Sequence, residues 1–218
     1  GGNISHGVPI SEFNQVKLNV EYEHFELSST LISPIIVKDF IKEEGDTFDS
    51  VKLTGSWSFD SRNRAIFADR GMLQSLSAEV TVPGLDLQYY KINYRQQHYI
   101  PLTELFTLSL NAELGYGGGY GDFDDLPFFE NFFAGGVRTV RGFEDNTLGP
   151  RSNDQFDDPI GGALKTVGNV ELIFPPPFFA DSNSFRMLGF FDIGNVFADA
   201  DDFDANELRY SVGVGATW

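Results

Sequence analysis

The sequence predicts an all-β protein, and specifically an antiparallel transmembrane β-barrel with about eight or nine strands. Three observations support this prediction. Apolar and polar residues alternate with a period of two along most of the chain, whereas the 3.6-residue period of helices is nearly absent. Several alternating runs reach about ten residues, beyond the five or six that are usual in soluble sheets. Short turns also alternate with long acidic loops, as in outer-membrane barrels.

The strands follow one another as a meander. A short first strand is expected at residues 3–10, and in the second Val16, Leu18 and Val20 face away from Lys17 and Asn19. The other alternating runs are 51–60, 75–82, 90–95, 106–116, 164–174, 185–197 and 208–218. Short turns are expected at 11–14, 62–71, 103–104 and 179–184, and the other connections at 28–50, 84–87, 117–162 and 198–206.

A soluble β-sandwich is the alternative to the barrel, since its strands also alternate. The length of the strands and the distribution of the aromatic residues favour the barrel. Aromatic residues gather near the strand ends, as an interfacial girdle requires: Tyr22, Trp57, Phe59, Tyr116, Phe174, Phe178, Phe179 and Trp218. The polar positions, small or charged, would line a wet lumen.

Composition excludes several classes of function. The 218 residues suit one domain, and the absence of cysteine removes disulfides, thiolate nucleophiles and thiolate-bound metals. A net charge of −17 argues against nucleic acid, because binding to phosphates needs clustered lysine and arginine. No apolar run has the roughly 18 residues of a spanning helix, and the first residues do not resemble a signal peptide.

Catalytic and metal-binding patterns are weak. The three histidines, His6, His24 and His98, lie far apart, without a Gly-x-Ser-x-Gly elbow or a His-Glu-x-x-His pair. The acidic runs 122–125, 154–158 and 199–204 lack the spacing of a calcium loop, so solvated loops are the simpler interpretation. We therefore expect no enzymatic activity, no cofactor and no metal.

The segment 135–143 stands out within its long acidic connection. It begins with Gly135 and Gly136 and contains Arg141 between Val140 and Gly142, with Phe143 following. Glycines on both sides of an arginine permit a tight backbone path, which would present one cation and one aromatic ring to a confined site. This connection is expected to enter a confined space rather than extend into water.

These residues resemble the BamA family of outer-membrane barrel assembly proteins, which belongs to a larger POTRA and surface-antigen barrel superfamily with related secretion transporters. The matching segments are 7–10, 80–84, 89–91, 126–136, 139–143, 146–150 and 191–194. The resemblance covers most of the chain, and the central segment 126–136 is its most specific part.

The resemblance implies that the loop at about 119–162 folds into the lumen, where Arg141 pairs with Glu171 and Asp192 on the barrel wall. The alternation supports this pairing independently. Glu171 faces away from Val170 and Leu172, with Lys165 and Asn169, and Asp192 faces away from Phe191 and Ile193. Two carboxylates on adjacent strands could accept one guanidinium group between them.

The resemblance also implies that residues 1–218 are part of a sixteen-strand barrel. The POTRA domains, the early strands and the last two strands would lie outside the sequence, together with the seam between first and last strands. Alone, about nine strands would leave two open edges. The sequence leaves three outcomes open: closure into a smaller barrel, pairing with a second copy, or an open sheet.

The implied function is non-enzymatic folding and insertion of β-barrel proteins into the bacterial outer membrane. The alternative within the family is a secretion or translocation transporter, and a soluble β-sandwich binding module is the alternative outside it. Implied partners are outer-membrane lipids and lipopolysaccharide, unfolded outer-membrane protein clients, and assembly lipoproteins that bind through the absent POTRA domains.

Overall fold

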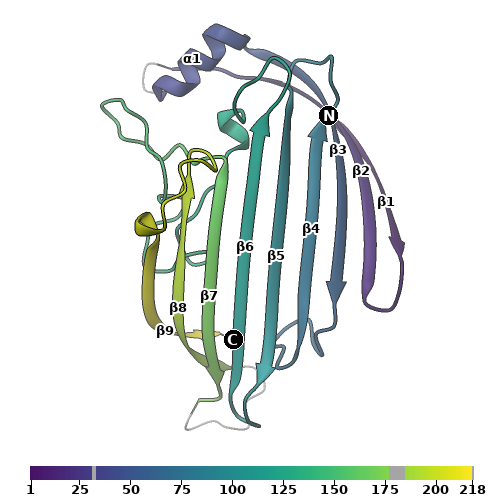
Figure 1. The fold of residues 1–218 in the computed structure, drawn as a ribbon, viewed down its shortest axis with the longest axis vertical. Helices are drawn as coiled ribbons and strands as arrows, with labels where there is room; N and C mark the ends of the chain where they lie inside the picture. The colour runs from purple at the N-terminus through teal and green to yellow at the C-terminus, as the bar shows by residue number, and fades with distance from the viewer. Residues whose placement is uncertain (31–32, 177–184, 218) are drawn as a thin grey trace.

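A computed structural model describes residues 1–30, 33–176 and 185–217, and in these residues the strands form one antiparallel sheet (Figure 1). The nine strands follow one another in sequence order: β1 (Gly2–Pro9), β2 (Asn14–Glu26), β3 (Thr47–Asp60), β4 (Gly71–Thr81), β5 (Tyr89–Pro101), β6 (Thr107–Gly119), β7 (Leu164–Phe174), β8 (Arg186–Phe197) and β9 (Arg209–Thr217). Each pairs with its neighbours in sequence, so the predicted all-β antiparallel meander is confirmed.

The two faces of the sheet differ in polarity, as period-two alternation requires. On what we call the outer face, Val20, Leu53 and Val80 lie side by side across β2, β3 and β4. They stay 47%, 41% and 40% exposed although they are apolar. An uncovered apolar face of this extent suits contact with lipid rather than water. The opposite, inner face carries the polar residues and is the face against which residues 120–163 pack.

Aromatic residues lie near both ends of the outer face. Phe59 packs against Phe13 at the end with the short turns, where Phe106 also packs against Phe174, and Tyr90 packs against Tyr116 near the other end. This distribution suits rings that lie at two lipid–water interfaces. Three other residues expected in the girdle, Phe178, Phe179 and Trp218, lie outside the described residues, as does the turn expected at 179–184.

The sheet is open in the described part of the chain, because β1 pairs with β2 alone and β9 with β8 alone. Of the three outcomes that the sequence left open, the single chain thus adopts the open sheet. The β-sandwich alternative is wrong, since the described strands form one sheet and not two packed layers.

The largest differences from the sequence-based expectation are a helix and the length of one strand. The connection expected at 28–50 contains a helix, α1 (Ile35–Glu44), which lies across one end of the sheet, and β3 already begins at Thr47 (Figure 1). Strand β5 continues to Pro101, six residues beyond the run 90–95. The alternating run stops at residue 95 because the polar residues Gln96 and His98 occupy outer-face positions. No helix among the described residues is long and apolar enough to cross a membrane.

The long β6–β7 connection, residues 120–163, supplies much of the buried core. Near α1 its residues Leu126 and Phe132 join Phe48 of β3, Tyr89 of β5 and Leu87 of the β4–β5 connection. A second cluster brings loop and wall together further along: Ala134, Val140, Leu148, Val167 and Val196. The loop also contains the short 3₁₀ helix η1 (Phe128–Glu130), and a second one, η2 (Ala205–Glu207), precedes β9. These apolar contacts hold the loop against the inner face, which positions its charged side chains.

Candidate functional site

Arg141 lies between two carboxylates of neighbouring strands, and we call these three residues the Arg141 site. Its Nη1 is 2.7 Å from Glu171 Oε1 on β7, and its Nη2 is 2.7 Å from Asp192 Oδ1 on β8. Its Nε and its backbone N–H donate to the other oxygen of Asp192, at 2.7 and 2.9 Å. The structure therefore brings together the three residues that the sequence singled out, in the fork geometry that arginine offers to carboxylates.

The wall around Asp192 is built to hold a charge away from water. The Asp192 side chain has no exposed surface, and Asn169 on β7 donates one N–H to its Oδ1 and another to the backbone oxygen of Thr139. Asn169 and Asp192 are register partners, so the pairing of β7 with β8 fixes their contact. The guanidinium carbon of Arg141 also lies 3.7 Å from the ring centroid of Phe190, which gives a cation–π contact.

The glycines of the motif allow the loop to reach this site. Gly135, Gly136 and Gly142 have φ values of 110°, 90° and 87°, a region that side-chain-bearing residues rarely adopt. Between them, Val140 is fully buried against the wall in the second core cluster, and Phe143 packs at its edge. The motif thus combines backbone freedom, one apolar anchor and one cation.

The charge of Arg141 is retained in this setting. Burial alone would lower its pKa, but the hydrogen bonds to Asp192 and the negative charge of Glu171 outweigh burial, and the pKa lies above its ordinary value. The site is therefore an ion pair between a loop and a wall at every physiological pH. Because the guanidinium group keeps its proton, the role that the geometry supports is to position the loop.

Replacing Arg141 with alanine is expected to release the segment around residues 137–150 while the sheet stays folded. Asp192 would remain buried without its cation, which costs about 3–5 kcal/mol in comparable buried pairs. Protease cleavage within the loop should accelerate, and the heat-modifiable migration of the folded protein that carries this chain should persist. The cleavage rate of Arg141→Lys should lie between those of the unsubstituted protein and Arg141→Ala, because a lysine keeps the charge but cannot contact both carboxylates with one planar fork. Cleavage rates that match the unsubstituted chain would contradict the positioning role.

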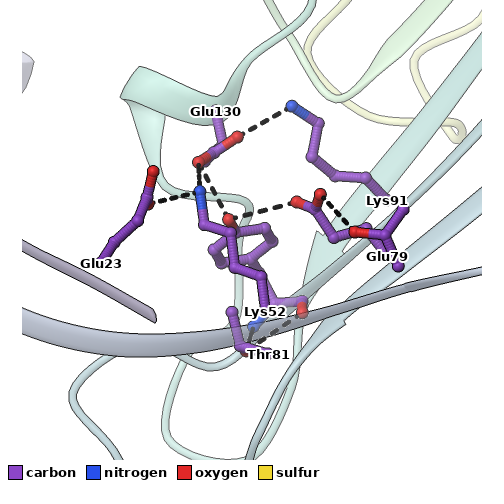
Figure 2. Close-up of polar contacts among 8 residues, drawn as sticks. Glu23, Lys52, Glu79, Thr81, Lys91 and Glu130 are labelled. Carbon is purple, nitrogen blue, oxygen red and sulfur yellow. Dashed lines mark hydrogen bonds and ion pairs between the residues drawn. The ribbon is translucent and has the colours of Figure 1, made fainter. Parts of the chain in front are cut away.

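A second polar cluster joins the same loop to another part of the wall, and sequence reasoning did not single it out. Glu130, at the end of η1, accepts from Lys52 on β3 at 2.8 Å and from Lys91 on β5 at 2.9 Å (Figure 2). The hydroxyl of Tyr89 donates to the same carboxylate at 2.9 Å. We call these four residues the Glu130 site. Lys52 also reaches Glu23 on β2, at 2.7 Å.

The Glu130 carboxylate is stabilised in its charged form. Burial alone would raise its pKa, but the positive charge of Lys91 and the hydrogen bonds from Lys52 and Lys91 outweigh burial and hold the pKa below the ordinary value of 4.5. A carboxyl group whose pKa is lowered by folding stabilises the folded protein, and this stabilisation is fully present at a pH above the ordinary pKa of the group. This stability is lost as the pH falls through the lowered value in the folded protein.

Acidification is therefore expected to loosen the loop near η1 at a pH below 4.5. Hydrogen–deuterium exchange of amides 120–134, corrected for intrinsic rates, should rise as the pH drops through the lowered pKa of Glu130. In a Glu130→Gln variant these amides should already exchange quickly at neutral pH and show a smaller further change. An equal rise in both proteins would assign the acid effect to other carboxylates.

Other candidate groups from the sequence do not assemble into a site. His24 lies 3.0 Å from Asp49 on the outer face, and His6 and His98 lie on other strands of that face. Among the described residues, no group of three or more aspartate, glutamate or histidine side chains could hold a metal ion. In the acidic run 154–158, Asp154 has a structural contact, because it accepts from the backbone N–H of Ile35 at the start of α1.

Comparison with known proteins gives matches along the entire chain. Residues 1–218 match the family described as the Omp85 superfamily domain. The chain is 34% identical to the outer membrane protein assembly factor BamA of Neisseria meningitidis over all of its length and 32% of the relative's. It is 30% identical to a sorting and assembly machinery component 50 homolog of Bos taurus over 71% of this chain and 33% of that protein.

A solved structure supports the same grouping. The crystal structure of BamA from Haemophilus ducreyi lacking POTRA domains 1–3 superimposes with a TM-score of 0.86 at 26% identity. The match covers 99% of this chain and 47% of that one. The chain thus spans about a third of the length of the two sequence relatives and about half of the solved chain.

Proposed function

Because this chain belongs to the Omp85 superfamily and corresponds to the barrel region of a BamA homologue, we propose that it is part of an insertase for β-barrel proteins. In this proposal it helps to fold such proteins and insert them into the bacterial outer membrane, without enzymatic chemistry. The observation that carries the proposal is the match along residues 1–218 to an outer membrane protein assembly factor. The names of the two sequence relatives both describe assembly.

The two faces of the sheet have properties that support this proposal. The apolar outer face suits contact with lipid, and the inner face carries a loop fixed by ion pairs. A protein that guides another protein into the membrane needs a surface of fixed shape. The charge-assisted contacts between the loop and the strands make this surface rigid. The Arg141 site would have the role of keeping the loop inside the lumen during insertion.

The partners in this proposal follow from the function. Clients would be unfolded outer-membrane proteins, and the outer face would contact outer-membrane lipids and lipopolysaccharide. Assembly lipoproteins would bind through POTRA domains of the parent protein. The two open edges of the sheet, β1 and β9, expose backbone donors and acceptors that can pair with another strand, including a strand of a second copy.

Reconstitution tests this proposal. The protein carrying this chain, made with its natural partners, would be placed in lipid vesicles and given an unfolded, urea-denatured β-barrel client. An insertase should yield client that resists protease and migrates in its folded, heat-modifiable form, in excess of empty vesicles. A secretion transporter, the alternative within the family, would instead deliver client into the vesicle lumen in soluble form. Client that inserts no faster than in empty vesicles would contradict the proposal.

A further inference from the structure

The loop of residues 120–163 is attached to the wall by charge at two separate places. Glu130 contacts Lys52 and Lys91 on β3 and β5, whereas Arg141 contacts Glu171 and Asp192 on β7 and β8. The polarity is reversed between the two places: the loop supplies the anion at the first and the cation at the second. The two sets of residues have no member in common, so either can be removed without touching the other.

The backbone between the two attachments has a natural point of division. Gly135 and Gly136 both have positive φ, and they separate the segment that carries Glu130 from the segment that carries Arg141. A leucine of each segment also packs in a different apolar cluster. Leu126 belongs to the cluster around Phe48 and Tyr89, whereas Leu148 belongs to the cluster around Val167 and Val196. The loop thus has two ion-pair sites and two apolar clusters, and its two segments meet at Ala134, which belongs to the second cluster and accepts from the backbone N–H of Leu148.

Glu130 is the anion that neutralises two largely buried lysines. Lys52 and Lys91 stand on either side of β4 with their side chains largely buried, and Glu130 is placed between their ammonium groups (Figure 2). Glu23 gives Lys52 a second carboxylate, but Glu130 is the only carboxylate within ion-pair distance of Lys91 in the described residues. Removing the Glu130 charge would leave a largely buried lysine without an anion, which is costly.

We propose that Glu130 is a second positioning residue of the loop, which fixes residues 120–133 on β3 and β5 independently of Arg141. The segment around Arg141 can then leave β7 and β8 while the first segment stays in place. The inference rests on the proposed function only for its purpose, which is to keep the loop in the lumen if the Arg141 site opens during insertion. The attachment itself is a property of this chain that can be measured without any client.

Two reporter positions make the test symmetrical. Leu126 and Leu148 are each 7% exposed and lie in the two different apolar clusters, and the printed sequence contains no cysteine. Leu126→Cys and Leu148→Cys would be introduced into the protein that carries this chain. The rate of labelling of each cysteine with a maleimide would then be measured in isolated outer membranes. Each reporter would be combined with Glu130→Gln, with Arg141→Ala, and with neither.

We expect Glu130→Gln to raise the labelling rate at position 126 by about 10- to 100-fold and to leave position 148 unchanged. Arg141→Ala should do the opposite. Glu113→Gln is the matched control, because Glu113 pairs with Lys165 at 3.1 Å between two strands of the wall, and it should change neither rate. Labelling that rises equally at both positions for either variant, or an unchanged rate at 126 in Glu130→Gln, overturns the proposal.

Two further measurements keep the result interpretable. Heat-modifiable migration shows whether each variant is assembled, and if Glu130→Gln is not, Glu130→Asp should show a smaller rise confined to position 126. A uniform rise in Glu130→Asp again overturns the proposal. Client insertion by the Glu130→Gln, Arg141→Ala double variant then tests the purpose separately. Selective labelling with full insertion by the double variant would support the second attachment and contradict its use in the proposed function.

Discussion

Replacing Asp192 with asparagine should release the segment around residues 137–150 and reduce client insertion more than any other change on the inner face. Asp192 receives three hydrogen bonds from Arg141, including one from its backbone N–H, and a fourth from Asn169. Asparagine keeps the shape but removes the charge and turns one acceptor into a donor that faces a guanidinium group. Breaking a buried pair on one side costs about 3–5 kcal/mol.

Glu171→Gln is the matched comparison for this prediction. Glu171 makes one ion-pair contact with Arg141, at 2.7 Å, and its side chain is partly exposed, so losing its charge should cost about 1–2 kcal/mol. Loop cleavage by protease and the yield of folded client would be measured for both variants in reconstituted vesicles. We expect the Asp192 variant to be affected severely and the Glu171 variant mildly. The reverse order would show that the deeper carboxylate does not dominate the site.

Replacing Gly135 with alanine should prevent the loop from adopting its path. Gly135 has a φ of 110°, and an added Cβ would lie 2.4 Å from the backbone oxygen of Glu144. The residue cannot move aside easily, because its N–H donates to the Thr139 hydroxyl and its carbonyl accepts from the same group. Backbone strain of about 1–3 kcal/mol would therefore add to the steric overlap.

The readout for Gly135→Ala is the protease resistance of the loop together with its effect on assembly of the barrel. We expect rapid cleavage near residues 137–150 and a reduced yield of heat-modifiable protein. Gly189→Ala on β8 is the control, since a Cβ there meets nothing within 4 Å and its φ lies outside the restricted region. That variant should behave like the unsubstituted chain. Similar behaviour of the two variants would indicate that the loop path tolerates a side chain at Gly135.

Alternation was sufficient to predict which side chains share a face. Glu171 and Asp192 were assigned to the polar face because their neighbours in sequence are apolar, and both side chains do lie on the inner face with Asn169. The strand is a local structure with a strict period, so each residue's face follows from its immediate sequence context. The assignment of Arg141 to these carboxylates came instead from the resemblance, since a loop has no period.

The Glu130 site could not be found in this way. Glu130 lies 78 residues from Lys52 and 39 from Lys91, so their meeting depends on the register of three strands and on the path of the loop. Helix α1 was missed for a different reason. It has ten residues, begins after Pro34, and is held through Phe40 by rings of β3 and the loop rather than by a long amphipathic pattern.

The two ion-pair sites have a mechanical consequence for the sheet. Through one loop they connect β3 and β5 to β7 and β8, and so act as a cross-brace over the middle of the sheet. A braced sheet resists changes of curvature within the braced span, whereas the strands beyond it can still bend. Deformation under lateral pressure from the bilayer should therefore concentrate in β1, β2 and β9, the strands of this chain that lie outside the braced span.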